Sequence, residues 1–447
     1  MSFPYSMNTV PEHTGPLPDE VDVVVIGGGI VGVMSAYFLN QRGLRAVVLE
    51  KGRIAGEQSG RNWGWVRQQG RDPAELPIMI EANRIWKDLA QKCDRDIGLR
   101  WNGVLYLADK PEEVGRYEDW MVHAREHGVD TQILTKAAVA EKVSGASRDW
   151  NAGLWTASDG RAEPWVALPS IARHAASTGV IIRENCAVRS MDVEGGRVAG
   201  VVTEAGRIRA PKVLLAGGAW SSLFARAHGV DLPQLSVRAT VTATRKMPEA
   251  FTGGAAAKGF AFWRRADGCY GMAQSDFHDV YIGPDTFRHF GRFVRHLSEG
   301  GFGNTYRPMS PKGFPDGWGT PRHWSADQET PFERQRMLNP APSTRRVRQM
   351  ARDFGKLYPQ LGPVEIRSSW AGMIDTMPDV VPVIDNAPSL PGLTIATGMS
   401  GHGFGIGPGV GRVVADLIAE NDIGHDLSRF RIGRFTDGSR LEVGPGL

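Results

Sequence analysis

Three glycines near the start of the chain have the spacing of a phosphate-binding turn. In Gly27-x-Gly29-x-x-Gly32 the first glycine permits a tight turn, and the second lets a pyrophosphate approach the backbone. The third lets a helix pack against the sheet, with its N-terminal N–H groups facing the phosphates. Glu50, 18 residues after Gly32, is placed to accept hydrogen bonds from a ribose diol. The spacing predicts a dinucleotide site and leaves open whether the dinucleotide is FAD or NAD.

The elements expected around these glycines are those that such a site requires. A β-branched run at 21–26 predicts a strand, and 30–41 predicts a helix that ends at Gly43. The apolar run at 44–49 predicts a second buried strand. Strand, glycine turn, helix and strand therefore follow one another within about thirty residues, as in a nucleotide-binding βαβ unit.

Two later segments lead back toward the same kind of turn. The runs 213–216 and 393–396 predict buried strands, and each is followed by a glycine-rich loop. A last helix is expected at 411–421, after the second of these loops. Because the chain reaches one site from three distant regions, we expect domains that are discontinuous in sequence.

Composition narrows the class of protein. The chain has 447 residues, of which 41% are hydrophobic and 23% charged, which is ordinary for a globular protein of two or three packed units. The net charge of +3 is too close to balance to favour nucleic acid as a partner. No apolar window approaches the ~20 residues of a membrane span, and residues 1–20 read as an extended tail. These features favour a cytoplasmic protein.

Cysteine and histidine spacing gives no support to a metal site. Cys93, Cys186 and Cys269 are far apart and lack CxxC spacing, which argues against a disulfide framework and against structural zinc. The histidines form no HxxxH or HxH pair of ligands. We therefore expect no metal.

Three motifs resemble one family of flavoenzymes. The run AGEQSGR at 55–61 and the run VLLAGGAW at 213–220 resemble FAD motifs of the D-amino acid oxidase superfamily. The loop GMSGHGFGIGPGVG at 398–411 resembles the C-terminal flavin loop of monomeric sarcosine oxidases. Over nearly the whole chain after about residue 20, the sequence resembles the bacterial L-amino acid deaminases of the Proteus type. Four runs carry this resemblance: LEKG…AGEQSGR at 49–61, NCAVR at 185–189, LAGGxWSxLF at 215–224 and TPFE at 330–333.

The resemblance implies a fold, a cofactor and a division of the chain. The expected fold is α/β, with a doubly wound, Rossmann-like FAD-binding domain and a second substrate domain on a mixed or antiparallel sheet. The FAD-binding domain would comprise 21–76, 151–234 and 362–447, and the substrate domain 77–150 and 235–361, including an insertion at about 288–345 that lies over the surface. No Cys or His lies between 51 and 80 and no Cys in 345–447, so non-covalent FAD is expected.

The resemblance also implies cofactor-binding residues. Val188 would bind the adenine through its backbone, and 403–406 would present N–H groups to the flavin pyrimidine oxygen, stabilising the anionic reduced flavin. The full set is Gly27, Gly29, Gly32, Glu50, Lys51, Gln58, Ser59, Arg61, Asn62, Val188, Gly217, Trp220, Gly403, Phe404, Gly405 and Ile406.

Such enzymes oxidise a C–H bond beside an amine nitrogen, and an amino-acid substrate needs a cation for its carboxylate. Three carboxylate-binding residues of the resembling families are missing from this sequence. Where some families carry an Arg after a Trp-x-Gly, Trp370-Ala371-Gly372 is followed by Met373 and Ile374. Ser275 aligns with the Arg of the Proteus-type deaminases, and Gly405 aligns with the Lys of sarcosine oxidases.

Arg67 falls where sarcosine oxidases place a carboxylate-binding Arg, so we expect it to be the anchor. Arg71, Arg264 and Arg265 are fallback candidates. The alternative is a surface Arg67 paired with Asp72.

Aromatic residues and a histidine complete the expected catalytic set of Arg67, Trp65, Trp370 and His402. Trp63, Trp65 and Trp370 would form an aromatic wall for an apolar side chain or an alkylated ammonium, with core packing as the alternative. His402, beside the flavin loop, would polarise the ring or the substrate, unless it is a structural loop histidine.

Residues 287–297 combine aromatic and basic side chains, a pattern compatible with contact to a membrane surface. A solvated basic helix is the favoured interpretation, and the electron acceptor, oxygen or a component of the respiratory chain, is left open.

The expected function is oxidation of an amino acid or related amine, giving an imine that hydrolyses to a keto acid or aldehyde. An N-alkyl amino acid oxidase of the sarcosine type and a hydroxy-acid dehydrogenase are alternatives within the fold. A flavin-binding subunit without turnover of its own is the alternative from another class.

Overall fold

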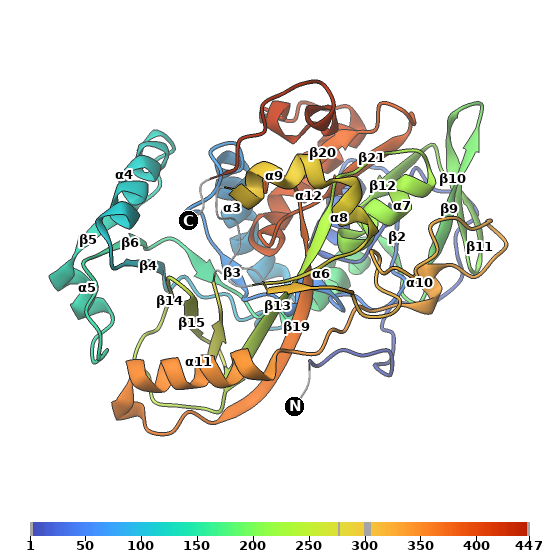
Figure 1. Cartoon of the computed structure of the whole chain (residues 1–447). Coiled ribbons are helices and arrows are strands. Elements are labelled where there is room, and N and C mark those ends of the chain that lie inside the picture. Colours follow the sequence, from blue (N-terminus) through green and yellow to red (C-terminus); the bar gives the residue numbers. More distant parts are fainter. Residues whose placement is uncertain (1–2, 276–277, 299–304, 445–447) are drawn as a thin grey trace.

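A six-stranded sheet forms one half of the molecule in the computed structural model, which describes residues 3–275, 278–298 and 305–444 (Figure 1). Its strand order is β20-β21-β12-β1-β2-β8, and all neighbours are parallel except the edge strand β20. The strands are β1 (Val23–Ile26), β2 (Ala46–Leu49), β8 (Ile181–Arg183), β12 (Lys212–Leu215), β20 (Val383–Asn386) and β21 (Leu393–Thr397). The carboxyl ends of the parallel strands meet at one edge, where ligands bind in such sheets.

Both faces of this sheet are covered, as its apolar strands require. Val23 and Val25 of β1 face a helical layer, whereas Val24 faces the three-stranded sheet on the other side, because successive side chains alternate. The helical layer contains α1 (Ile30–Gln41), α3 (Leu76–Lys92), α6 (Pro164–Ser177) and α12 (Gly403–Ala419). The three-stranded sheet consists of β9 (Val188–Glu194), β10 (Arg197–Thr203) and β11 (Gly206–Arg209).

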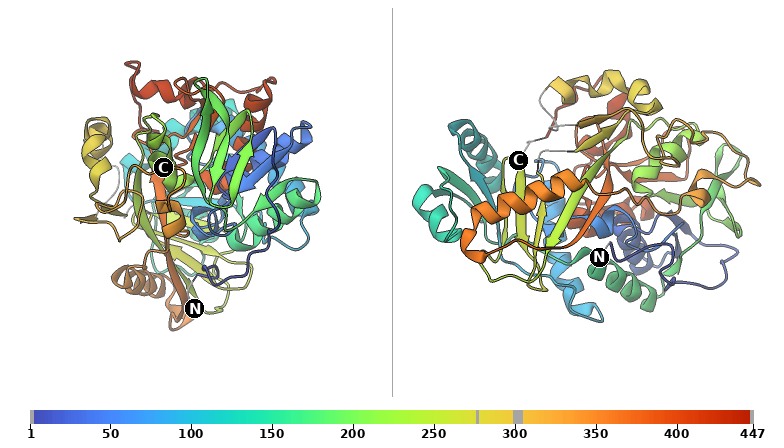
Figure 2. Two further views of the ribbon diagram at one scale, coloured as in Figure 1. Left: turned by 90° about the vertical axis from the view of Figure 1, so that its right-hand side faces the viewer. Right: turned by 60° about the horizontal axis from the view of Figure 1, so that its bottom comes forward.

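The other half is built on a large mixed sheet, with β13 (Leu235–Thr244) and β19 (Ile366–Thr376) paired antiparallel along their whole length (Figure 2). Helix α11 (Thr344–Leu357) packs on one face through Met350 and Phe354, and α4 (Pro111–Glu126) covers part of the opposite face. The remaining strands are β4 (Val104–Ala108), β5 (Thr131–Thr135), β6 (Ala152–Thr156), β14 (Gly254–Ala257), β15 (Phe260–Arg264), β16 (Tyr270–Ala273), β17 (Asp279–Tyr281) and β18 (Thr305–Arg307).

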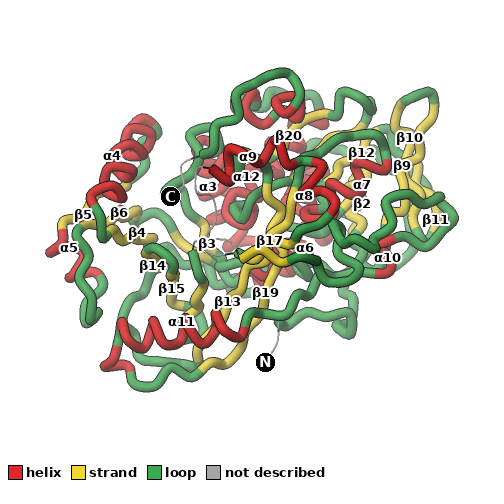
Figure 3. The backbone as a smooth tube through the Cα atoms, viewed as in Figure 1, coloured by secondary structure: helices red, strands yellow, loops and turns green. Residues whose placement is uncertain are grey.

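Short elements connect the two halves. The small sheet of β3 (Trp65–Val66) and β7 (Gly160–Arg161) lies at their junction. Residues 308–343, between β18 and α11, consist of loops and turns apart from the short helix labelled α10 in Figure 3. The short helices are α2 (Gln58–Arg61), α5 (Lys136–Lys142), α7 (Ser221–Ala227), α8 (Pro284–Arg288), α9 (Phe290–Ser298) and α10 (Pro331–Arg334).

The local predictions around the glycine turn are confirmed, and the domain division differs in detail. The expected helix 30–41 is α1, and the expected strands correspond to β1, β2, β12 and β21. However, β6 and β19 belong to the large sheet, although 151–234 and 362–447 were expected in the FAD-binding domain. No strand was expected at either position, and a local pattern does not show which sheet a strand joins.

The last helix begins eight residues earlier than expected, at Gly403 rather than 411. Glycine and Pro408 lower its helix propensity, so the sequence pattern underestimates its length. Close packing favours glycine here: a Cβ at Gly407 would lie 2.6 Å from Ile30 Cγ2, and one at Gly409 would lie 2.4 Å from the Ile78 carbonyl oxygen. Tertiary packing against α1 and α3 thus outweighs local preference.

The described part of the N-terminal segment, 3–20, forms no helix or strand but packs on the protein surface. Phe3 is buried, and the Arg53 guanidinium donates to the backbone oxygens of Met7 and Thr9. The Glu184 carboxylate accepts the backbone N–H groups of residues 12 and 13. Among the described residues, no helix combines the length and the apolar character needed to cross a bilayer.

Candidate functional site

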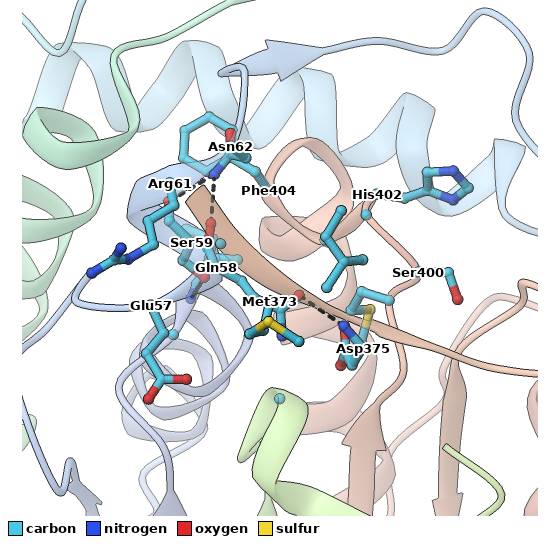
Figure 4. Close-up of a pocket in the computed structure, with 18 of the residues that line it drawn as sticks. Glu57, Gln58, Ser59, Arg61, Asn62, Met373, Asp375, Ser400, His402 and Phe404 are labelled. Atoms are coloured by element: carbon cyan, nitrogen blue, oxygen red, sulfur yellow. Dashed lines mark hydrogen bonds between the residues drawn. The ribbon is translucent and has the colours of Figure 1, made fainter. Parts of the chain in front are cut away.

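A cavity of about 1070 Å³ opens where the carboxyl ends of the parallel strands meet the large sheet. Its walls come from the turns after β1, β2, β12 and β21 and from the facing strands β13 and β19. Figure 4 shows side chains of residues 57–62 together with side chains of β19 and of the loop leading into α12. Sixteen of the expected site residues line this cavity: Gly27, Gly29, Glu50, Lys51, Gln58, Ser59, Arg61, Asn62, Trp65, Arg67, Val188, Gly217, Trp220, His402, Gly403 and Phe404.

The glycine turn has the geometry that its spacing predicts. Gly27 has φ +114°, a conformation that L side chains rarely adopt. Gly32 lies behind the cavity wall, and a Cβ there would be 2.0 Å from the Gly27 carbonyl oxygen. The Glu50 carboxylate accepts the N–H groups of Gly28 at 2.8 Å and Gly52 at 2.6 Å, and burial raises its pKa. The turn therefore brings backbone N–H groups and an acid to one wall.

The loop that contains α2 joins the turn to the large sheet. The Ser59 hydroxyl accepts the N–H of Ile30 at 3.0 Å, which caps the start of α1. The Asn62 amide donates to the Ser59 carbonyl at 2.9 Å and so stabilises the loop. The Gln58 amide reaches the Asp375 carboxylate of β19 at 2.9 Å, a contact that spans both halves of the molecule.

Arg61 is a buried cation at this junction. Its guanidinium donates to the carbonyls of Gly56 at 2.8 Å and Ala371 at 2.9 Å, and it stacks on the ring of Phe3. Burial lowers its pKa to about 10, and its Nη2 has no hydrogen-bond partner among the described residues. A buried donor without a partner is costly, so a ligand oxygen in the cavity would satisfy it.

Part of the segment expected as a surface insertion packs against one wall of the cavity, which Phe332 lines. The Lys51 ammonium forms an ion pair with Glu57 at 2.8 Å and lies 4.3 Å from the centre of the Trp220 ring. It also donates to the backbone carbonyls of residues 335 and 336. Phe332 packs edge-on against Trp220 and lines the cavity. The segment around 330–339 is thus part of the site.

The first turn of α12 provides N–H groups at the opposite wall. Gly403 and Phe404 line the cavity and belong to a helical turn whose N–H groups have no partner within the helix. Gly405 and Ile406 lie behind this wall. The Gly405 carbonyl accepts the indole N–H of Trp86 at 2.8 Å, and Ile406 is buried in the core.

The cavity continues along the large sheet, lined there by several basic and aromatic side chains. Arg67 lies over the ring of Tyr106, at 5.5 Å from its centre, and donates to the Gln69 carbonyl. No described carboxylate pairs with Arg67, and Asp72 pairs instead with Arg429 at 2.9 Å. This side of the cavity, called the large-sheet side below, is lined by Trp63, Trp65, Arg67, Arg71, Tyr106, Glu113, Arg116, Tyr117, Ala256, Lys258, Ser275 and His402.

The fallback arginines have different positions. Arg71 lines the cavity and is fully buried. Arg264 donates to the Met247 carbonyl at 2.9 Å, and Arg265 pairs with Glu163 at 3.0 Å, both outside the cavity lining. Of these three candidates, only Arg71 can reach a ligand in the cavity.

The expected aromatic wall is only partly present. Trp63 and Trp65 line the cavity in edge-to-face contact, with ring centres 5.1 Å apart. Trp370 is not among the lining residues; it is buried against Trp165, and its indole donates to the Arg61 carbonyl at 2.8 Å. Trp370 therefore supports the Arg61 loop from behind, which corresponds to the core alternative.

Several lining residues were not expected from the sequence. Asp375, Ser400, Glu57, Tyr106 and Phe332 all reach the cavity. Asp375 is a buried carboxylate that accepts the N–H of residue 398 at 2.9 Å, and burial raises its pKa. Glu57, Phe332 and Ser400 lie within quoted motifs but were not singled out there, whereas local pattern gave no signal for Tyr106 and Asp375. Within the described ranges, no three His, Cys, Asp or Glu side chains are grouped as metal ligands.

Comparison with known proteins gives a consistent picture. Residues 22–417 match the family model described as FAD dependent oxidoreductase. The structure of L-amino acid deaminase from Proteus myxofaciens, solved with anthranilate, superposes with a TM-score of 0.90 at 30% identity and covers 96% of each chain.

Two curated relatives are sarcosine-oxidising proteins by name. Sarcosine oxidase subunit beta of Arthrobacter sp. is 28% identical over 459 residues, which is 97% of each chain. Human mitochondrial sarcosine dehydrogenase is 29% identical over 243 residues, which cover 52% of this chain and 26% of that protein. The chain thus spans about a quarter of the length of that longer relative.

Proposed function

Because the chain belongs to the family of FAD-dependent oxidoreductases, we propose that it oxidises an amino acid at the C–H bond beside the amine nitrogen. The observation that carries the carboxylate part of this proposal is the position of Arg67. Its guanidinium faces the cavity and has no described acidic partner, so it is available to a substrate carboxylate.

The residues that line the cavity fit the chemistry of FAD. The Gly27 turn has no side chain in the path of a pyrophosphate, and the buried Arg61 Nη2 has a vacant donor position. The N-terminal turn of α12 places positive backbone dipoles opposite this turn. When bound, FAD supplies the acceptor for the hydride that leaves the substrate.

The charges on the large-sheet side favour an anionic substrate over a simple amine. Arg67, Arg71, Arg116 and Lys258 line it together with the carboxylate of Glu113, and the Asp375 carboxylate of β19, which also lines the cavity, is engaged with Gln58 and the N–H of residue 398. Glu113 already accepts the backbone N–H groups of residues 109 and 110 at the start of α4. A carboxylate entering this region would be attracted electrostatically, while Trp63 and Trp65 provide apolar contact for the rest of the substrate.

An N-alkyl amino acid is the second candidate substrate. The similarity to sarcosine oxidase subunit beta over 97% of each chain supports it, and Arg67 would serve either substrate in the same way. The similarity to an L-amino acid deaminase supports a primary amine. Both reactions give an imine that hydrolyses in water. The two reactions can therefore be distinguished by identifying the product that retains the carboxylate.

The test is an anaerobic titration of the purified protein followed by its visible spectrum. L- and D-amino acids, N-methyl amino acids and the corresponding amines without a carboxylate are added in turn. We expect bleaching of the flavin band by a carboxylate-bearing amine and not by its decarboxylated analogue. A yellow protein that none of these reduces would contradict the proposal and favour a subunit without turnover. Readmission of air then tests oxygen as the acceptor.

The role of Arg67 is tested by a pair of variants. Arg67→Ala removes one bidentate, charge-assisted contact, so we expect kcat/KM for the carboxylate substrate to fall about 10- to 100-fold, mainly through KM. The matched control is Arg264→Ala, which removes a guanidinium outside the cavity. Equal kinetics of Arg67→Ala and the control would show that Arg67 is not the anchor.

A further inference from the structure

Glu75 is a buried carboxylate that the expected chemistry does not use. Its side chain is 1% exposed, and neither carboxylate oxygen has a hydrogen-bond partner among the described residues. It precedes α3 and lies behind the cavity wall. Burying such a group is costly unless other charges compensate for it, so its neighbours are informative.

Two cationic or protonatable side chains face Glu75. Its Oε2 lies 3.6 Å from Nδ1 of His402 and 3.9 Å from Nη1 of Arg71. Arg71 is also buried, and its guanidinium donates to the Arg67 carbonyl at 3.1 Å. Although burial opposes ionisation of Glu75, His402, Arg71 and Arg67 together lower its pKa. These neighbouring charges therefore favour the ionised form of Glu75.

His402 connects this carboxylate with the cavity. It is the residue before the first turn of α12, and it lines the cavity beside Gly403. Nδ1 of His402 is buried on the side that faces Glu75. The 25% of the side chain that is exposed therefore belongs to its other atoms. Burial and the charge of Arg71 lower the pKa of His402, and the charge of Arg67 also lowers it. Glu75 acts in the opposite direction and raises that pKa.

We propose that Glu75 is a positioning residue that keeps the neutral His402 ring with Nδ1–H toward the carboxylate and Nε2 toward the cavity. In that tautomer Nε2 carries a lone pair and takes a proton from the ammonium group of the incoming substrate. The N–H bond of the ammonium breaks, an Nε2–H bond forms, and the negative charge of Glu75 stabilises the imidazolium. The neutral amine that remains is the form that can lose a hydride.

This inference rests on the proposed amine oxidation and adds the step that prepares the amine. The competing explanation is structural: Glu75 only joins the loop of Arg71 to α12. The two differ in their effect on the pH profile, because a structural link gives no reason for the acid limb to move, whereas a positioning residue sets the basicity of the His402 ring and its loss moves that limb.

The test is a double-mutant cycle with Glu75→Gln and His402→Gln, using the rate of anaerobic flavin reduction over a range of pH. We expect Glu75→Gln to slow reduction at least tenfold and to move the acid limb of the profile to lower pH, because the imidazolium loses its counter-charge. In the His402→Gln background, Glu75→Gln should change the rate less than twofold. Equal losses in both backgrounds, or no loss in either, would overturn the proposal.

The matched control is Glu81→Gln in α3, the helix that Glu75 precedes. Glu81 also contacts a histidine, His425 at 2.7 Å, and pairs with Arg412, but it does not line the cavity. The Glu81→Gln substitution removes a comparable Glu–His contact between α3 and the C-terminal region. It therefore measures the purely structural effect of losing such a contact. Its reduction rate and pH profile should match those of the unmodified protein.

A second measurement uses the unmodified protein and does not depend on turnover. With ¹⁵N-labelled histidine, the imidazole signals absent from His402→Gln identify His402. We expect Nδ1 protonated and Nε2 unprotonated at neutral pH. The opposite tautomer would refute the positioning role even if amino acids reduce the flavin, whereas failure of every amine to reduce it would refute the proposed function.

Discussion

Replacing Gly32 by alanine tests whether close packing behind the glycine turn determines cofactor binding. The new Cβ would lie 2.0 Å from the Gly27 carbonyl oxygen and 3.2 Å from Val25 Cγ1. Because the first of these atoms belongs to the backbone, the turn or the helix must move by at least about 1 Å. Overpacking of this kind costs about 1 to 3 kcal/mol, which corresponds to roughly 5- to 150-fold weaker FAD binding if the strain falls on the turn.

The assay is titration of the FAD-free protein with FAD, followed by quenching of flavin fluorescence, together with thermal unfolding. The control is Gly115→Ala in α4, where a Cβ meets no atom within 4 Å. That change should leave FAD binding unaffected and stabilise the helix by up to about 1 kcal/mol. If Gly32→Ala binds FAD within twofold of the unmodified protein and unfolds at the same temperature, the packing argument for the third glycine is wrong.

Two further predictions concern one buried and one partly buried carboxylate. Asp379→Asn removes the charge that pairs at 2.8 Å with Arg434, a side chain that is only 4% exposed. In thermal unfolding this should destabilise the protein by about 3 to 5 kcal/mol. The control Asp437→Asn, which breaks an exposed pair with Arg431, should not destabilise it in this way. Burial and the neighbouring Asp285 raise the pKa of Asp316 to about 7. The folded state therefore retains a proton that the unfolded chain loses near pH 4, and this group's contribution to stability falls as the pH rises from about 4 to 7. The unfolding temperature of Asp316→Asn relative to the unmodified protein should rise across that range; a constant difference would contradict the assignment.

The parts of the fold that follow from local pattern could be predicted from the sequence. The β1–α1–β2 unit depends on a β-branched run, a glycine turn and a helical stretch within about thirty residues, and its bounds agree closely with expectation. The start of α12 could not be predicted in this way. Its glycines are unfavourable for a helix in isolation and become favourable only because Ile30 and Ile78 lie against them.

The site shows the same limit at longer range. The residues of the glycine turn and of the 55–62 loop line the cavity because their motifs are themselves the local structure. By contrast, the contact of Gln58 with Asp375 and that of Glu75 with His402 each join positions more than 300 residues apart in the chain. No spacing rule connects such positions, so Glu75 gave no signal and Trp370 was expected at the cavity instead of behind Arg61.

The distribution of the cavity walls along the chain has a consequence for biosynthesis. The glycine turn is made at residues 27–32, whereas the opposite wall, from Thr397 to Phe404, follows about 370 residues later. At ribosomal rates of 5 to 20 residues per second, about 20 to 75 s separate the two. During that interval the emerging chain has half of a nucleotide pocket, with the apolar carboxyl ends of β1 and β2 uncovered. Cofactor capture is therefore a late event in maturation, and the supply of free FAD in the cell would influence how much of the newly made chain reaches its final form.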